Sequence, residues 1–441
     1  FRTGGTTYLS VPQFYGEVEV YEAFAEAAFP LLRDVVGAKN LTAEVSARVA
    51  DYSMKNVGTV LSYRAGLSWE PIDNYAVRAN FARSQRAPSI TELLSPPRSD
   101  FGSFTDPCRF VTATSTDNGH ANCRLEPGIA AAITADGEFT ENDNNFSPNG
   151  GNTDVTEETG DTFTVGITMA PEFISGFRMA VDYYNITVSD AISSLREEQI
   201  LERCYDSPVG TPWGSDNEYC QLITRDEDGA LIEVIQNVQN LNELTSKGYD
   251  IAAEYTFNVA DLGSFTLKAD MTHVIERSQT SVDKGVTLKE EYSGYLGTFK
   301  DKASASLTWR MDSLRLRWRT TYRGPVTDSR GRETAYYEPL NGDGDGGIFL
   351  ENEAACQAGE ASCVANPEAP FNHKLGSYIK HDFSASYNMN INDDYRLRVY
   401  AGVNNIFDNA GPFLVFDNDN YSSNYGGGVG RYVYAGASLR F

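Results

Sequence analysis

Six cysteines are the residues of this 441-residue chain whose type and spacing most directly suggest a chemistry. Each of their three close pairs lies in a segment rich in Gly, Asn and Asp, so we predict three local disulfides formed in an oxidising compartment. Reduced thiols are the alternative. A zinc site does not fit, because CxxC pairs are missing and the four histidines are scattered. The predicted pairs are Cys108 with Cys123, Cys204 with Cys220, and Cys356 with Cys363.

Catalytic and phosphate-binding patterns are missing from the sequence. No nucleophile elbow is present, and no glycine-rich phosphate loop joins a strand to a helix. Residues 342–347, Gly-Asp-Gly-Asp-Gly-Gly, loosely resemble a calcium loop. They lack the later Glu that an EF-hand requires, so a flexible acidic loop is favoured. We therefore expect no enzyme, no metal site and no cofactor.

Charge and hydropathy narrow the class of protein further. The net charge is −25, with 61 acidic against 36 basic residues, which argues against a nucleic-acid partner. No stretch approaches the roughly 18–20 apolar residues of a membrane helix. Aromatic residues make up 12% of the chain, which favours β-structure over a disordered chain.

An alternation with period two, repeated over segments of about ten residues, dominates the sequence. Along residues 433–441 every second side chain is apolar, ending at Phe441, and the intervening residues are polar or small. Segments 395–404 and 314–323 repeat the pattern, with arginines at the polar positions. Strands of this kind fit a sheet with lipid on one side and a water-filled or plugged lumen on the other, although a soluble sandwich also alternates.

The connections between strands distinguish these two possibilities. They are alternately short and long, with only 53–56 short on the long side, which is typical of an outer-membrane barrel. A Greek-key sandwich has no reason to sort its loops by side. We predict thirteen strands, at about 15–29, 40–52, 57–70, 74–87, 160–171, 176–189, 243–257, 263–276, 300–311, 313–324, 377–390, 395–407 and 430–441. The predicted extracellular loops are about 1–14, 88–159, 190–242, 277–299, 325–376 and 408–429.

Aromatic residues gather beside the short turns. They match the aromatic girdle that membrane barrels place at the bilayer interface. Aromatics of a protein core at the strand ends are the alternative. The residues are Trp69, Tyr75, Phe177, Trp309, Tyr395 and Phe441.

Four passages resemble TonB-dependent outer-membrane receptors, in the order found in that family. Residues 401–408, Ala-Gly-Val-Asn-Asn-Ile-Phe-Asp, closely resemble the G-x-N-N-L-F-D penultimate strand. Residues 83–93 resemble the strand end F-R-A-P-x-x-x-E-L, and residues 151–159 resemble G-N-P-x-L-x-P-E-x with both prolines replaced. Residues 430–441 resemble the last strand of outer-membrane barrels, whose terminal aromatic, here Phe441, is read by the barrel-assembly machinery.

The resemblance implies an all-β, transmembrane, antiparallel up-and-down barrel of about 22 strands, filled by an N-terminal plug. The thirteen strands would be the C-terminal ones, so the plug, the TonB box and the earlier strands would lie outside this chain. Half a barrel leaves unpaired edges in lipid, so the N-terminal part of the same receptor is an expected partner. Further implied partners are TonB and outer-membrane lipid, and a surface lipoprotein remains open. The implied location is the outer membrane of a Gram-negative bacterium.

The implied function is TonB-dependent active uptake of a scarce solute. A ferric siderophore is the default cargo, and an oligosaccharide, a peptide or cobalamin are other candidates. A passive porin-like or adhesin-like barrel is the alternative, and it would need no plug. An outer-membrane enzyme is a third class, which would require an acid/base set at one rim that the sequence does not show.

The resemblance also sorts the inward-facing residues. Arginines near the short turns are expected to pack against plug carboxylates, and arginines near the outer rim to face an anionic ligand. For each of them, an ion pair within the lumen is the alternative. Aromatic residues of the outer loops are expected to stack on a ligand or only to order the loops. The plug-facing candidates are Arg315, Arg317, Arg396 and Arg398, and the ligand-binding candidates are Arg86, Arg323, Trp213, Tyr336, Tyr337, Phe413 and Tyr421.

Overall fold

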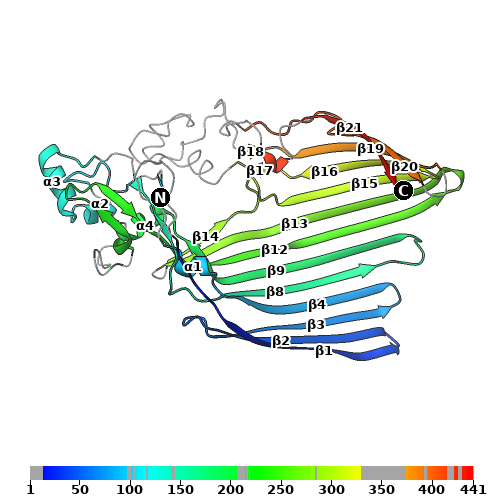
Figure 1. Ribbon diagram of the computed structural model, residues 1–441, viewed down its shortest axis with the longest axis horizontal. Helices are drawn as coiled ribbons and strands as arrows, with labels where there is room; N and C mark the ends of the chain where they lie inside the picture. Colours follow the sequence, from blue (N-terminus) through cyan, green and yellow to red (C-terminus); the bar gives the residue numbers. More distant parts are fainter. Residues whose placement is uncertain are drawn as a thin grey trace, which may run out of the picture.

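The computed structural model forms one broad, twisted sheet with a smaller lobe beyond one end of its strands (Figure 1). No helix in the part of the chain that the structure describes is long and apolar enough to cross a membrane. The structure describes residues 13–96, 101–102, 106–115, 118–140, 145–205, 214, 217, 219–283, 286–328, 374–391, 395–414, 422–425 and 430–440.

Thirteen strands follow one another in chain order across the main sheet, and each is antiparallel to its neighbours. The predicted number of strands and the antiparallel, all-β architecture are confirmed. The outermost strands, β1 and β21, are not neighbours in the strand order, so the described strands form an open sheet and not a closed barrel. The strands are β1 (Val20–Val35), β2 (Ala38–Tyr52), β3 (Thr59–Ile72), β4 (Tyr75–Arg86), β8 (Glu158–Met169), β9 (Phe177–Ser194), β12 (Gln236–Val259), β13 (Gly263–Asp283), β15 (Asp301–Met311), β16 (Leu314–Arg323), β19 (Tyr378–Asn390), β20 (Arg396–Asn404) and β21 (Tyr432–Arg440).

The first strand differs from the prediction. We expected it at 15–29, but β1 starts at Val20, ends at Val35 and contains Pro30. Its pairing with β2 shifts between Pro30 and Leu32, which marks a β-bulge. Proline has no N–H for the hydrogen-bond ladder, and it is tolerated at bulges and on edge strands. Both conditions hold here, so the strand continues through the proline.

Short and long connections lie at opposite ends of the sheet, as predicted. The short-turn end is at the right of Figure 1 and the long-loop end at the left. Gly37, Asn74 and Asp312 in the short turns have φ values of 80°, 67° and 48°. This left-handed conformation suits tight hairpins, and Gly, Asn and Asp adopt it most readily. Two short strands, β7 (Asn149–Gly150) and β14 (Val286–Glu291), pair with β12 and β13.

Two long connections fold together into a lobe at the long-loop end, called the cap: the described residues of 101–146 and 195–234. The sequence did not predict it. One buried apolar cluster draws on both segments, including Ile129 from the first and Leu201 from the second. The cap contains α2 (Asn118–Cys123), α3 (Pro127–Asp136), α4 (Glu197–Tyr205) and a sheet in the order β10 (Ile223–Arg225), β11 (Leu231–Val234), β6 (Asn145–Phe146), β5 (Phe101–Gly102).

A second buried cluster lies where three other connections leave the long-loop end. Tyr425 packs edge-on against Phe299 and Tyr378, with ring centroids 5.2 and 5.6 Å apart. The strands β17 (Val326–Thr327) and β18 (Lys374–Leu375) pair beside it. Its buried members are Phe299, Val326, Leu375, Tyr378, Leu414 and Tyr425.

Candidate functional site

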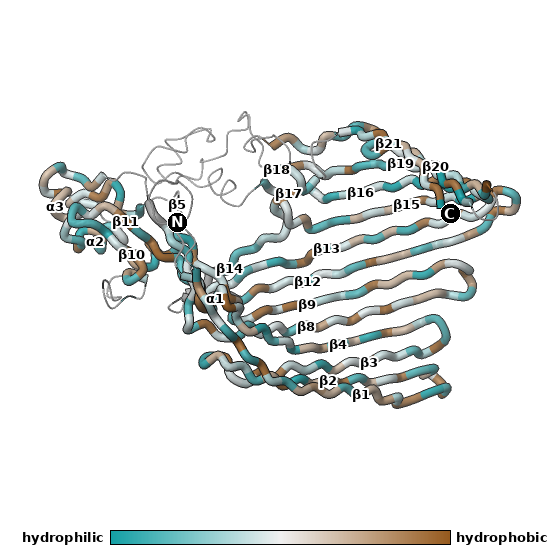
Figure 2. The backbone as a smooth tube through the Cα atoms, in the orientation of Figure 1, coloured by the Kyte–Doolittle hydropathy of each residue, from teal (hydrophilic) through white to brown (hydrophobic). Residues whose placement is uncertain are grey.

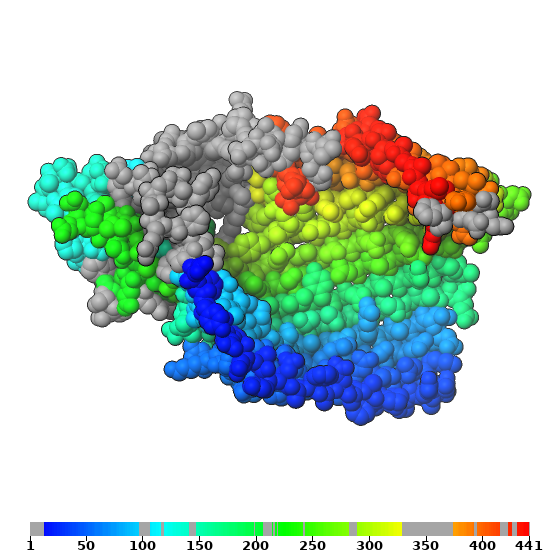
Figure 3. All heavy atoms as spheres, viewed as in Figure 1, coloured from blue at the N-terminus to red at the C-terminus, as the bar shows by residue number. Residues whose placement is uncertain are grey.

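The strand register divides the main sheet into two chemically different faces. Residues directly opposite one another on neighbouring strands lie on the same face of the sheet. The strand pairing therefore assigns every second residue of each strand, from β1 to β21, to one face. Figure 2 shows hydrophobic and hydrophilic residues interleaved along the strands. On the apolar face, Leu67, Leu267 and Leu307 are 44%, 44% and 40% exposed. Figure 3 shows the strands side by side in one continuous surface. An apolar face that runs across thirteen strands requires apolar surroundings.

Rings border the apolar face near the short turns. Phe177, Tyr255, Phe257, Phe265 and Trp309 follow one another with neighbouring centroids 6.5, 5.1, 5.4 and 6.2 Å apart. The Trp309 indole N–H donates to the carbonyl of Leu262 in the adjacent turn. On β3, the Trp69 indole N–H donates in the same way to the carbonyl of Gly37 at 2.9 Å. A ring with an apolar body and a polar edge is suited to a membrane–water interface.

A second band of rings lies toward the long-loop end of the same face. Tyr249 stacks on His273 at 4.9 Å, and the His381 ring lies 5.5 Å from Trp318. On β13, Phe265 in the first band and His273 in the second are eight residues apart, which is about 26 Å along a strand. Strands of membrane barrels are tilted by about 35–45°, so this length corresponds to a height of about 20 Å, somewhat less than the apolar band of about 25 Å.

The opposite side of the sheet, called the polar face, carries charged pairs from β1 to β13. An Arg78 Nη lies 2.7 Å from each carboxylate oxygen of Asp182. Glu254 accepts from both Arg178 and Lys268. This part of the polar face is called the paired region. Its other pairs are Arg48 with Glu22, Arg64 with Glu44, and Arg86 with Glu158.

From β15 to β21 the polar face is called the cationic strip. The described strands there carry ten cationic side chains on this face and one carboxylate, that of Asp382. Arg310 lies directly opposite Arg315, and like charges in such positions destabilise a sheet unless they are neutralised. Among the described residues of the strip, the carboxylate of Asp382 pairs with Lys380 at 3.7 Å. The cations are Lys302, Arg310, Arg315, Arg317, Arg319, Arg323, Lys380, Arg396, Arg398 and Arg440.

A hollow of about 450 Å³ lies on the polar face where the paired region meets the cationic strip. One side of it is acidic and the other basic. Asp182 is held by Arg78, and Asp250 accepts from the Thr272 hydroxyl at 2.6 Å. The acidic lining residues are Asp182, Asp250 and Asp270, and the basic ones are Lys302, Arg319 and Arg323. The predicted ligand contact Arg323 therefore lies at a site of mixed charge.

Arg86, at the end of β4, is anchored by two carboxylates. Its Nη1 and Nη2 lie 2.9 and 3.0 Å from Glu92, and its Nε lies 2.5 Å from Glu158. Glu92 is positioned by α1 (Ile90–Leu94), which starts with a capping box between Ser89 and Glu92. The passages 83–93 and 151–159 thus meet through Arg86. For Arg86 the structure shows the ion pair that the sequence analysis gave as the alternative to a ligand contact. Its contact with a ligand stays a prediction.

The passage 401–408 closes the end of β20. The backbone N–H of Asn405 donates to Asp382 at 2.8 Å, and its side chain exchanges hydrogen bonds with the backbone of Asn409. Asp408 accepts from the N–H of Arg431, at the start of the last strand, at 2.7 Å. Asn405 and Asp408 have φ values of 53° and 57°, which Asn and Asp tolerate better than other side chains. The motif therefore ties β19, β20 and β21 together.

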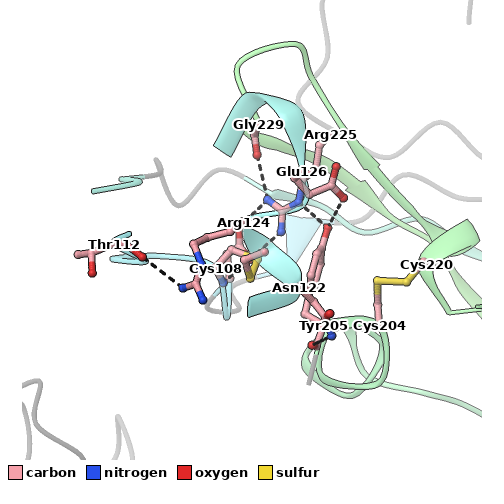
Figure 4. Close-up of a disulfide and its surroundings, with 12 residues drawn as sticks. Cys108, Thr112, Asn122, Arg124, Glu126, Cys204, Tyr205, Cys220, Arg225 and Gly229 are labelled. Atoms are coloured by element: carbon pink, nitrogen blue, oxygen red, sulfur yellow. Dashed lines mark hydrogen bonds and ion pairs between the residues drawn. A yellow bond between two sulfur atoms is a disulfide. The ribbon is translucent and has the colours of Figure 1, made fainter. Parts of the chain in front are cut away.

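Two of the three predicted disulfides are confirmed. Cys108 is bonded to Cys123 and Cys204 to Cys220, with Cα–Cα distances of 5.5 and 4.9 Å. Both lie in the cap (Figure 4). The third pair, Cys356 and Cys363, lies outside the described residues.

A buried ion pair that the sequence analysis missed joins the two segments of the cap. Arg225 donates from Nη1 and Nη2 to the two oxygens of Asp106 at 2.6 and 2.8 Å, and their side chains are 5% and 1% exposed. The Tyr205 hydroxyl accepts from Arg225 Nε at 2.8 Å and donates to Glu126 at 2.9 Å (Figure 4). Burial raises the pKa of this hydroxyl. Asp106 and Arg225 are 119 positions apart, so no local signal connects them.

The remaining predicted residues divide into three groups. Arg315, Arg317, Arg396 and Arg398 lie in the cationic strip near the short-turn end. Phe413 is 62% exposed at the long-loop end. Trp213, Tyr336, Tyr337, Tyr421 and Phe441 lie outside the described residues. Sequence reasoning missed Arg310, Arg319 and Arg440 as members of the strip, although each occupies a polar alternate position of its strand.

The sheet and its motifs agree with a protein-family model described as TonB dependent receptor-like, beta-barrel, which matches residues 2–406. No curated protein matches the chain in sequence.

Solved structures share the fold. The chain is similar to a mutant of the ferric enterobactin receptor PfeA from Pseudomonas aeruginosa, with a TM-score of 0.53 and 16% identity over 96% of this chain and 45% of that one. It is likewise similar to the siderophore receptor PirA from Acinetobacter baumannii, with a TM-score of 0.52 and 15% identity over 96% and 46%. The chain spans less than half the length of either receptor.

Proposed function

Because the chain belongs to the TonB-dependent receptor family, whose members are outer-membrane β-barrels, we propose that it takes part in active, TonB-dependent uptake of a scarce solute. The observation that carries the proposal is the two-faced sheet. Its apolar face, with a band of rings toward each end, is suited to lipid. Its polar face is continuous over thirteen strands and is suited to line a lumen.

We propose that the long-loop end, with the cap, faces the cell exterior and that the short turns face the periplasm. The loop lengths support this orientation, because membrane barrels place tight turns on the periplasmic side. The two disulfides of the cap also fit an oxidising exterior. The extracellular connections are then about 1–14, 88–159, 190–242, 277–299, 325–376 and 408–429.

A ferric siderophore is the cargo that we propose as the default. The solved neighbours bear the names of a ferric enterobactin receptor and a siderophore receptor, and this supports the class of cargo for the chain without naming one. Among the described candidate contacts, Arg323 faces the charged hollow and Phe413 is exposed. Arg86 could contact a ligand only after releasing one of the carboxylates that it now binds, such as that of Glu92. Trp213, Tyr336, Tyr337 and Tyr421 are the remaining proposed contacts.

Further proposals concern the rest of the receptor. The N-terminal part of the same receptor supplies a plug, and TonB acts through that plug. Arg315, Arg317, Arg396 and Arg398 pack against its carboxylates, which would neutralise part of the cationic strip. Phe441 serves as the signal for barrel assembly.

Uptake of radiolabelled ferric siderophores tests the proposal. The complete receptor that contains this chain is expressed in a Gram-negative strain without siderophore receptors of its own, and in the same strain without TonB. Accumulation of at least one ferric siderophore only when TonB is present is the expected result. Equal accumulation in both strains, together with a steady ion conductance in planar bilayers, would overturn it in favour of a passive porin.

A further inference from the structure

A small pocket in the cationic strip collects three arginines. It has a volume of about 160 Å³ and lies on the polar face, across β16, β19, β20 and β21. The register explains the grouping: Arg315 is opposite Ser386, and Arg317 is opposite Ser384. This three-arginine pocket is lined by Arg315, Arg317, Ser384, Ser386, Arg398 and Tyr400.

No carboxylate among its lining residues neutralises these guanidinium groups. The nearest acid in the register, Asp382, already accepts from the backbone of Asn405. The Nε of Arg317 is buried and has no hydrogen-bond partner. A buried donor without a partner is uncommon in folded proteins, because it loses its hydration without compensation. The pocket therefore lacks an acceptor.

Two tyrosines form a fixed wall of the pocket. Tyr400 lies over Gly436 and Tyr434 over Gly402, so closely that a Cβ on either glycine would lie 2.4 Å from the facing hydroxyl oxygen. The Arg398 guanidinium carbon lies 5.8 Å from the Tyr400 ring centroid. A ring at this distance attracts the cation without using its N–H donors, which stay available for an acceptor.

We propose that the three-arginine pocket binds one carboxylate or similar small oxyanion. Arg315, Arg317 and Arg398 neutralise it, and the serine hydroxyls complete its hydrogen bonds. The location inside a lumen rests on the proposed function, but the binding itself does not require transport. Two sources can supply this chemistry: a carboxylate of the plug, as proposed above for these arginines, or a free anion, for which the pocket would be a separate site.

Inorganic phosphate is the probe for a free anion. The thermal unfolding midpoint of the complete, detergent-purified receptor is measured in phosphate and in chloride at equal ionic strength. If the anion is free, phosphate raises the midpoint of the wild type, and the Arg315→Gln/Arg398→Gln double variant weakens phosphate binding at least tenfold, about 1.4 kcal/mol. Arg319→Gln, on the same strand but outside the pocket, keeps the response. Heat-modifiable gel mobility checks that each variant is folded.

Carbodiimide coupling tests the other source. In Arg315→Lys the charge is kept and a primary amine is introduced, so a carboxylate in contact becomes linked and is identified by mass spectrometry. Arg64→Lys, beside Glu44 in the paired region, is the positive control. A link from position 315 to an Asp or Glu supports a protein carboxylate, and a phosphate response supports a free anion. If neither the link nor the phosphate response is observed, the proposal that the pocket binds an oxyanion is wrong. Failure of TonB-dependent uptake with either response intact would overturn the transport proposal alone.

Discussion

The cap and the main sheet use apolar side chains in opposite ways. In the cap, Ile129, Ile200 and Leu201 are 0–1% exposed, and the lobe has a core like that of a soluble domain. In the sheet, leucines such as Leu267 remain 44% exposed on the apolar face, while most charged residues of the strands lie on the polar face. One chain is thus built for two surroundings, water at the cap and lipid along the strands. Each of the following changes is expected to damage one region and spare the other.

Asp106→Ala is expected to have the largest effect. It leaves the Arg225 charge buried without its carboxylate, which costs about 3–5 kcal/mol of cap stability. Hydrogen exchange should rise in 195–234 while the amides of β12 and β13 keep their protection. Asp136→Asn, at an exposed position of α3, is the control. Equal loss of protection in cap and sheet would contradict the comparison.

Leu267→Arg tests the opposite region. It places a charge on the apolar face two residues from the first band of rings. A cost of about 2 kcal/mol to the sheet is expected there, because a charge costs about 2–4 kcal/mol at the bilayer midplane and less toward the interfaces. Ser304→Arg, on the polar face opposite Asp270, is the matched control and should be nearly neutral. The measurement is the urea midpoint of the folded form in lipid vesicles. If both variants lost the same stability, the assignment of the two faces would be wrong.

Cys108→Ser with Cys123→Ser should loosen the cap by about 2 kcal/mol, because the loop between them regains conformational freedom when unfolded. The cap's thermal transition should shift, whereas the heat modifiability of the barrel should stay unchanged. An unaltered cap transition would mean that the buried cluster alone holds the cap together.

A pH effect on the cap is the smallest expected. Burial raises the pKa of the Tyr205 hydroxyl above its ordinary value of about 10, so the cap is fully stable below that pH. It loses stability as the pH rises from about 10 toward the raised pKa, because only the unfolded chain ionises in that range, and the loss is about 1 kcal/mol near pH 11. Tyr205→Phe should remove this dependence while lowering stability at neutral pH. The measurement is the thermal unfolding transition of the cap in the wild type and in Tyr205→Phe from pH 8 to 11. An equal pH dependence in both would contradict the prediction.

The sequence predicted the strands well because their alternation is local. Even the stretch around Leu267 and Trp309 shows its two faces without knowledge of any partner strand. The cap was missed because its folding depends on contacts such as Asp106 with Arg225, 119 positions apart. Of the cationic strip, the sequence analysis singled out Arg315, Arg317, Arg323, Arg396 and Arg398. Arg310 opposite Arg315 follows only once the two-residue loop between their strands is placed correctly, because loop length fixes the register of a hairpin.

The disulfides of the cap imply an order of assembly. Each bridge joins cysteines only 15 or 16 positions apart within one loop. Either loop can therefore be oxidised alone, before the two loops meet. The Asp106–Arg225 pair links the two loops, so it can form only when both loops have come together. Covalent closure of each loop can therefore precede the ion pair, and the ion pair reports that the two loops have joined into one lobe.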